Sequence, residues 1–382
     1  MSTKTRNEPT FNAFTTADGR TIDFIDGYYE AHNRKRSGYV ADNVFVENVK
    51  SDRDKLHSEP FSFSAFIKDV GVFSLMRDAL ISIGLKGPWP KGLDVGGAEG
   101  AVARLMRGSG LVNWVACNDY IDLADKLPTS LFWKYYARYR IARATGGKLP
   151  KFRLPTLANN LGPTAATSAS FWTHRLRTMP KLDAYIADDF YKLPTGQRFD
   201  LISSLLVINY FDAEEKLARV AQLLNEGGTF VLLASSFWWP VNAAFIVGKF
   251  PYTSQRLNRR DLERYLREHH PEEAEDAMKR YDYFHKTGHK PTLDDYIELA
   301  DKHRLSLLKA DYLIPIEERH KKTPLTPFAL ENTTDLPLSK VLADVQTHRP
   351  DVRLVDLKAA YVLAVFRKRG GSDRTASALL KK

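Results

Sequence analysis

The sequence has only one cysteine, Cys117, among 382 residues. A single thiol excludes an intramolecular disulfide and a cluster of thiolate ligands around a metal. The sequence also has no clustered set of carboxylates that would favour a metal ion, and we expect no metal site. The initial string MSTKTRNEPTFNAF has no apolar core of the kind found in signal peptides, and we expect a cytoplasmic location.

One run without charged residues, 227–248, is long enough to span a bilayer. Pro240, Asn242 and two serines interrupt it, and its first half is rich in β-forming residues. We therefore expect a buried strand followed by an apolar loop or helix, and no membrane span. Shallow contact with a membrane surface is the alternative.

Acidic residues are scarce between positions 121 and 180. This segment has ten lysines and arginines against two aspartates, Asp122 and Asp125, which makes a net charge of +8 out of +10 for the chain. Such a segment attracts anions, including nucleic acid, phosphorylated metabolites and acidic lipid headgroups. A solvated basic surface is the alternative interpretation.

The order of apolar segments predicts an α/β fold. Strands alternate with helices after residue 90, which is typical of a mostly parallel sheet with helices on both faces. We expect a helix over 60–85 and another over 211–228 that ends at the glycine cap NEGG. Strands are expected within 92–95, 112–117, 181–190, 198–209, 229–236, 305–314 and 357–368.

These elements suggest a division of the chain. We expect an N-terminal helical extension or lid at 1–90 and an α/β domain at 91–368, followed by a disordered tail at 369–382. Insertions into the α/β domain are expected at about 121–180, 237–292 and 315–350.

The stretch GLDVGGAEG joins a predicted strand to a predicted helix and is typical of a ligand-binding turn. No G-x-x-x-x-G-K-[ST] string exists, which excludes a Walker-type phosphate loop. Ala98 and Ala101 occupy two of the three glycine positions of a dinucleotide fingerprint, which disfavours a nicotinamide-dependent oxidoreductase. S-adenosylmethionine has no phosphate, and its ammonium group favours a carboxylate such as Asp94 near small residues that let the backbone approach.

Acidic residues follow the next two strands at the edge where open α/β sheets bind ligands. Asp119 ends the second strand, where a carboxylate can accept hydrogen bonds from two ribose hydroxyls. Asp188 and Asp189 end the third strand, and one of them can accept from an adenine amino group.

Four segments in this order resemble the motifs of class I S-adenosylmethionine-dependent methyltransferases: LDVGGAEG, CNDY, IADDFYKLP and FDLISSLLVINYF…LLNEGGTFVLL. The resemblance covers about residues 91–234 without the basic insertion, and the two late strands. It implies a Rossmann-like seven-stranded, mostly parallel sheet closed by an antiparallel hairpin, with S-adenosylmethionine as cofactor. The implied cofactor-binding residues are Asp94, Gly96, Gly97, Ala98, Gly100, Asp119, Tyr120, Asp188, Asp189, Phe190 and Ser204.

Two departures from the family pattern bear on the acceptor. Ala98 replaces a common glycine, and the segment between the second and third strands is about sixty residues longer than the family core needs. In this inserted segment, helical spacing places four aromatic residues on roughly one side and Lys134 and Arg138 on the other; the aromatic residues are Phe132, Tyr135, Tyr136 and Tyr139. That arrangement suits single-stranded nucleic acid, a cap over a metabolite, or a helix docked on the sheet.

Candidate catalytic residues follow from where the methyl group would lie, past the fourth strand. Asn209 and Tyr210 occupy that position, with packing against the next helix as the alternative for Tyr210. His174 in the basic insertion is a candidate base, with an ordinary packing role as its alternative. Phe237, Trp238 and Trp239 follow the fifth strand and are expected to contact the substrate.

The sequence thus predicts a methyltransferase that acts on a small molecule, with an oxygen atom as acceptor. The basic and apolar insertions favour an amphiphilic or anionic acceptor, such as a glycolipid, an acyl or polyketide-like metabolite or a sugar. An RNA methyltransferase that uses the basic insertion is one alternative. A non-catalytic S-adenosylmethionine-binding partner protein is another. The oligomeric state stays open.

Overall fold

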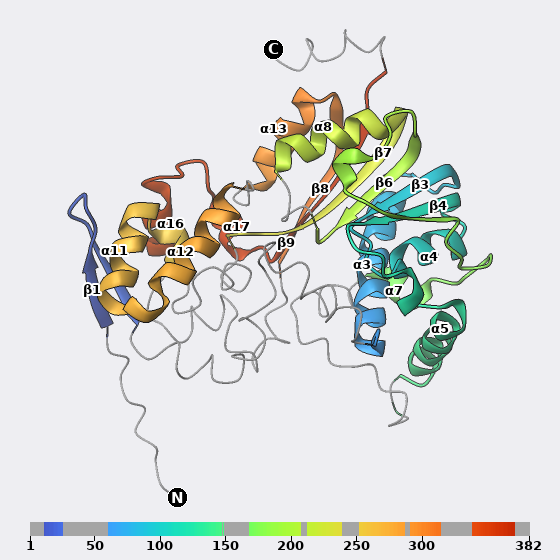
Figure 1. The fold of residues 1–382 in the computed structure, drawn as a ribbon, viewed down its shortest axis with the longest axis horizontal. Coiled ribbons are helices and arrows are strands. Elements are labelled where there is room, and N and C mark those ends of the chain that lie inside the picture. Colours follow the sequence, from blue (N-terminus) through green and yellow to red (C-terminus); the bar gives the residue numbers. More distant parts are fainter. Residues whose placement is uncertain are drawn as a thin grey trace, which may run out of the picture. The chain divides into compact units, whose positions relative to one another are not determined.

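The computed structural model describes residues 11–25, 60–146, 148, 168–207, 212–238, 252–286, 291–314 and 338–370. They belong to two compact units, each described by itself. One unit, the sheet unit, contains the large β-sheet and its helices. The other, the helical unit, is built from three separate parts of the chain (Figure 1).

The sheet unit contains seven strands, and its topology confirms the predicted α/β fold. The sheet order is β5-β4-β3-β6-β7-β9-β8, in which the first five strands are parallel. β9 runs antiparallel to both β7 and β8, as expected for a closing hairpin. The bounds are β3 Trp89–Val95, β4 Val112–Asp119, β5 Ala184–Ala187, β6 Phe199–Leu205, β7 Leu224–Ser235, β8 Leu305–Leu313 and β9 Tyr361–Lys368.

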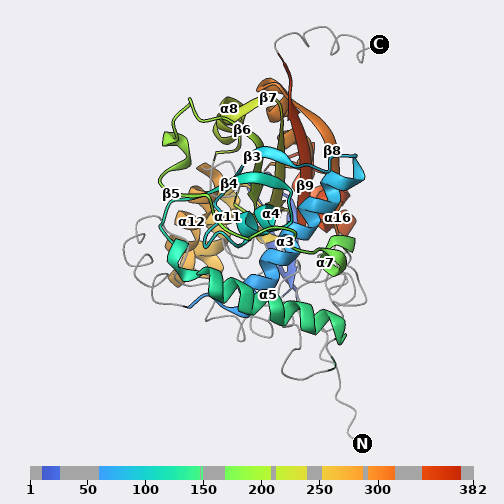
Figure 2. The same ribbon diagram turned by 90° about the vertical axis from the view of Figure 1, so that its right-hand side faces the viewer.

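Helices cover both faces of this sheet (Figures 1 and 2). α8 (Ala213–Leu223) and α13 (Leu293–Lys302) pack on one face, where alternate strand residues such as Ile202, Phe230 and Leu232 form a buried core. α3 (Phe63–Ser82), α4 (Ala101–Gly108), α5 (Thr129–Ala144) and α7 (Ala169–Thr173) form the other layer, in which α3 contacts α4, α5 and α7. Because both faces of the central strands are covered, β6 and β9 are buried along almost their whole length.

The predicted glycine cap after α8 is wrong. α8 ends at Leu223, and β7 begins at the next residue, so the sequence NEGG lies inside the strand. Leu224 pairs with Phe199 before a register shift, and the Asn225 side chain donates to Asp200 Oδ1 at 2.7 Å. The pairing of Leu224 with β6 therefore starts the strand before NEGG, and the four residues lie at the register shift between two strand pairs.

The helical unit differs from the predicted N-terminal helical extension. It contains a hairpin of β1 (Phe11–Thr15) and β2 (Thr21–Ile25), in which Phe14 lies opposite Ile22 and both are buried. The helices are α10 (Thr253–Arg256), α11 (Arg259–His269), α12 (Pro271–Lys286), α16 (Leu338–Gln346) and α17 (Leu354–Lys358). The described residues of the expected insertions at 237–292 and 315–350 belong to this unit, and the expected extension at 1–90 contributes to both units.

Within the described ranges, the structure contains no helix that is both long enough and apolar enough to cross a bilayer.

Candidate functional site

The turn between β3 and α4 requires glycine for steric reasons. Gly96 has a left-handed φ of +69°, and a Cβ atom there would lie 2.3 Å from Cγ1 of Val207. A Cβ atom on Gly97 would lie 2.6 Å from Oδ2 of Asp94 and 2.7 Å from Sγ of Cys117. Such distances are far inside van der Waals contact, so each side chain larger than hydrogen would displace the turn.

Ala98 occupies the position where the family commonly has glycine, and it adopts a left-handed φ of +45°. Two hydrogen bonds hold it there. Its N–H donates to Oδ2 of Asp119 at 2.9 Å, and its carbonyl accepts from the Tyr185 hydroxyl at 2.8 Å. These bonds connect the turn to the ends of β4 and β5.

Asn118 connects the same three elements through hydrogen bonds of its backbone carbonyl and its side chain. Its carbonyl accepts the N–H groups of Gly96 and Gly97 at 2.7 and 3.2 Å. Its side-chain amide donates to the carbonyls of Ile186 and Asp188 at 3.0 and 2.8 Å. The glycine turn, the end of β4 and the end of β5 therefore meet at one edge of the sheet.

Asp94 lies under the turn and is almost completely buried. The Ser203 hydroxyl donates to its Oδ1 at 2.8 Å, while Oδ2 lies below Gly97 and has no hydrogen-bond partner among the described residues. The pKa of Asp94 is raised to about 7: burial is the largest cause, the charge of Asp119 adds to the shift, and Ser203 and Lys216 oppose it.

Three more carboxyl groups share this environment: Asp69 on α3, Glu99 in the turn and Asp119 at the end of β4. Burial is the largest cause of the raised pKa of each, and the pKa of Asp69 reaches about 7. Glu99 and Asp94 add to the shift at Asp69, and Asp119 adds to that at Glu99. Carboxyl groups that repel one another favour a ligand with positive charge.

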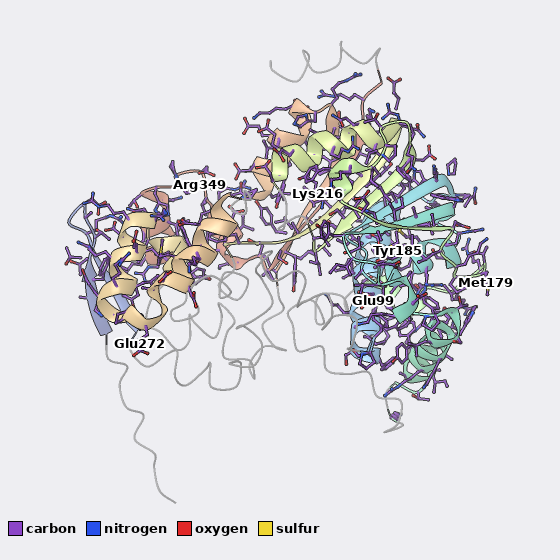
Figure 3. All side chains as sticks on the ribbon, in the orientation of Figure 1. Glu99, Met179, Tyr185, Lys216, Glu272 and Arg349 are labelled. Atoms are coloured by element: carbon purple, nitrogen blue, oxygen red, sulfur yellow. The ribbon has the colours of Figure 1, made fainter. Side chains whose placement is uncertain are left out.

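Lys216 lies in the first turns of α8 and is fully buried. Burial lowers its pKa well below the ordinary value, and Asp94 is the group that opposes this shift. Its ammonium nitrogen is 5.8 Å from the ring centroid of Phe190. Figure 3 labels Lys216 on α8, Tyr185 on β5 and Glu99 in the turn, all within the sheet unit.

The other predicted cofactor residues have different surroundings. Tyr120 is 66% exposed directly after β4. Asp188 is exposed and accepts from the Asp189 N–H at 2.7 Å, whereas Asp189 caps the short helix Phe190–Lys192 by accepting from Tyr191 N–H at 3.0 Å.

Phe190 and Ser204 are buried. Phe190 belongs to the core between the sheet and α8, and Ser204 lies on β6, where its hydroxyl has no hydrogen-bond partner among the described residues. Their predicted contact with a cofactor stays a prediction.

His174 is fully buried and lies away from the turn. Its ring packs against Phe73, Tyr136 and Tyr139 at centroid distances of 5.5 to 6.1 Å. Burial lowers its pKa to about 3, with nearby arginines adding to the shift. The following segment bonds to the carbonyl of Gly108, at the end of α4 opposite to the glycine turn. These surroundings support the packing role rather than that of a base.

The remaining candidates fall in two groups. Asn209, Tyr210 and Trp239 lie outside the described residues. Phe237 and Trp238 are 5% and 1% exposed in the core of the helical unit. Side chains so deeply buried cannot contact an acceptor unless that core opens, so the described structure gives these two no support as substrate contacts.

Sequence analysis missed three residues of the site. Tyr185 accepts from Leu123 N–H at 3.2 Å and lies 2.9 Å from the carbonyl of Ile121, besides its bond to the turn. Asn118 and Asp69 are the other two. A buried asparagine directly before the acidic residue at a strand end was the one signal available, whereas Tyr185 is indistinguishable from a core tyrosine and Asp69 from a surface aspartate of a helix.

The described residues contain no group of histidine, cysteine and carboxylate side chains suited to a metal ion.

Comparisons with known proteins add the following. No family model matches the sequence, and the search of curated proteins finds no match.

Solved structures similar to this chain include several methyltransferases. Geranyl diphosphate C-methyltransferase from Streptomyces coelicolor has 13% identity and a TM-score of 0.36, over 78% of this chain and 74% of that one. N-methyltransferase NodS from Bradyrhizobium japonicum, in complex with S-adenosylhomocysteine, has 13% identity and a TM-score of 0.33, over 90% of this chain and 100% of that one. Phosphoethanolamine N-methyltransferase 2 from Haemonchus contortus, in complex with S-adenosylmethionine, has 12% identity and a TM-score of 0.37. That match covers 83% of this chain and 60% of that one.

Similarity at this level carries no information on the acceptor. The strand order of the sheet, with its antiparallel strand between β7 and β8, is an observation on this chain itself. The chain has a Rossmann-like, seven-stranded fold, which is the sheet that the resemblance of its motifs implies.

Proposed function

We propose that this chain is an S-adenosylmethionine-dependent methyltransferase with a small-molecule acceptor. The observation that carries the proposal is the position of the Asp119 carboxylate, which ends β4 and lies 2.9 Å from the Ala98 nitrogen of the glycine turn. A carboxylate beside such a turn can accept both hydroxyls of a ribose, and Asp188 and Asp189 at the next strand end are available for the adenine.

The charges around the turn fit this cofactor. S-adenosylmethionine carries a sulfonium and an ammonium group, and when bound it supplies the methyl group and a sulfur leaving group. Asp94, Glu99, Asp69 and Asp119 would favour that positive charge, because burial raises the pKa of each carboxyl by disfavouring its charged form, which a nearby cation would stabilise. A dinucleotide, with two phosphates, would meet repulsion from the same groups.

Methyl transfer needs alignment of the acceptor and exclusion of water more than it needs a strong base. We propose an oxygen atom of an amphiphilic or anionic metabolite as acceptor, with Asn209 and Tyr210 beside the methyl group. This part of the proposal rests on the order of the motifs along the chain.

Calorimetric titration tests the cofactor directly. We expect S-adenosylmethionine and S-adenosylhomocysteine to bind and NADH not to bind. Asp119→Asn should weaken both by at least about tenfold, because it removes the charge from two hydrogen bonds. Asp125→Asn, an exposed aspartate of the short helix Ala124–Lys126, is the matched control and should bind normally.

Binding of NADH alone would overturn the proposal. Binding of both sulfur nucleosides without turnover of amphiphilic or anionic acceptors would instead support a non-catalytic S-adenosylmethionine-binding protein.

A further inference from the structure

The helix α5 in the basic insertion is attached to the sheet unit through its aromatic residues. Phe132, Tyr136 and Tyr139 are buried, and Phe132 packs edge-on against Phe66 of α3 at 5.3 Å. The Tyr135 hydroxyl donates to the carbonyl of Phe61 at 2.8 Å. The aromatic side of α5 is therefore used for packing.

The opposite side of α5 is exposed and mostly apolar. Trp133 and Ile141 are each 39% exposed, and Ala137 and Ala144 are also exposed. Their spacing of four, four and three residues places them along one stripe of the helix. This outer stripe is unusual, because the solvent side of a docked helix normally carries polar residues.

Basic residues border the outer stripe on both sides. Helical spacing places Lys134 and Arg138 along one border and Arg140 and Arg143 along the other. α5 contains no acidic residue, and none of these four cations forms an ion pair with a carboxylate among the described residues. Arg138 instead lies over the ring of Phe63 at 4.1 Å, and Arg143 over that of Tyr139 at 5.6 Å.

We propose that the outer stripe of α5 and its basic borders bind the surface of a bilayer that contains anionic phospholipids. An apolar stripe with a tryptophan between rows of cations has the arrangement of a helix that lies in the headgroup region. Apolar residues enter the boundary of the acyl chains, and an exposed basic side chain such as Lys134 reaches the phosphates. In Figure 2, α5 extends along its whole length across the front of the sheet unit.

Single-stranded nucleic acid fits this surface less well. Bases bind proteins by stacking on aromatic rings, and three of the aromatic residues of α5 are buried in the packing against the sheet unit. The outer stripe offers one aromatic ring, that of Trp133, and three aliphatic side chains, which suit lipid better than bases.

Co-sedimentation of the full chain with vesicles tests the proposal. We expect binding to phosphatidylcholine vesicles with about 30% phosphatidylglycerol to exceed binding to pure phosphatidylcholine by at least about tenfold. Lys134→Gln should weaken binding to the anionic vesicles by about fivefold, because each cation near the surface contributes by that factor. Lys302→Gln, an exposed lysine of α13, should leave binding unchanged.

A second pair of variants tests the contribution of the apolar residues of the outer stripe. Ile141→Gln should weaken vesicle binding severalfold, whereas Ile81→Gln, 42% exposed at the far end of α3, should not. Vesicles should shift the tryptophan emission to the blue, and Trp133→Phe should remove most of that shift.

Equal binding to both kinds of vesicle would overturn the proposal, as would equal losses in the paired variants. Binding of an oligouridylate without vesicle binding would replace it with a nucleic-acid surface. The cofactor titration on the same variants keeps this result separate from the proposed methyl transfer, because none of these residues lies at the glycine turn.

Discussion

Replacement of Asp94 by asparagine should change how the stability of the protein depends on pH. Asp94 is buried under the glycine turn, and its pKa is raised from the ordinary value of 3.8 to about 7. Asparagine keeps an oxygen for the Ser203 hydroxyl but cannot ionise. The variant therefore removes one titrating group from the buried site and leaves most of the packing in place.

The sign follows from the direction of the shift. The folded protein holds a proton on Asp94 at pH values where the unfolded chain has lost it, so the contribution of this group to stability is fully present below the unfolded pKa. That contribution is lost as the pH rises through the folded pKa. Between about pH 5 and about pH 8, wild type should lose about 2 to 3 kcal/mol more unfolding free energy than Asp94→Asn does.

Urea unfolding of both proteins at the two pH values measures this difference. Asp125→Asn serves as the control and should follow wild type at both. Asp69 also has a pKa of about 7, so it adds to the pH dependence of the unfolding free energy in both proteins. Its contribution cancels when the change between the two pH values is compared between wild type and Asp94→Asn. Parallel pH profiles for wild type and Asp94→Asn would refute the assignment of a buried, protonated carboxyl group to this position.

Other predictions concern the turn and its supports. Gly97→Ala should cost about 1 to 3 kcal/mol of unfolding free energy and abolish cofactor binding in calorimetry, because its methyl group would overlap the side chains below. Gly196→Ala, with nothing near its Cβ position, should change neither quantity; equal effects would contradict the steric argument. Tyr185→Phe should cost about 1 to 2 kcal/mol in urea unfolding, since it removes the bonds that hold the turn and the loop after β4. Ala98→Gly should raise the unfolding free energy by up to about 1 kcal/mol, because it relieves the left-handed φ; a loss of stability would argue against that conformation.

The sheet could be predicted because its signal is local. Each strand is an apolar run, and each binding motif follows a strand end, so the order of the motifs predicts the edge where they meet. The same reasoning failed at NEGG, where the pairing of Leu224 with Phe199 of β6 starts a strand before the helix-ending pattern. It also missed the β1–β2 hairpin, whose two buried side chains find their partners in residues more than two hundred positions away.

The environment of Trp238 shows a second limit. An uncharged run after a strand is typical of a substrate loop, yet Trp238 is buried in the helical unit beside residues from α11 and α16. The three parts of the chain that build this core are separated by whole elements of the sheet unit. A pattern read along the sequence cannot show which distant segments will cover an apolar side chain.

The path of the chain between the two units has a practical consequence for dissection of this protein. The chain leaves the sheet unit after β7, returns at α13, leaves again after β8 and returns at β9. No single cut or truncation can release either unit as one continuous piece. Removal of the helical unit requires one linker from Ser235 to Leu293 and another from Leu313 to Tyr361. The second can be short, since Leu313 and Tyr361 lie opposite each other in an antiparallel pair that a tight turn can close.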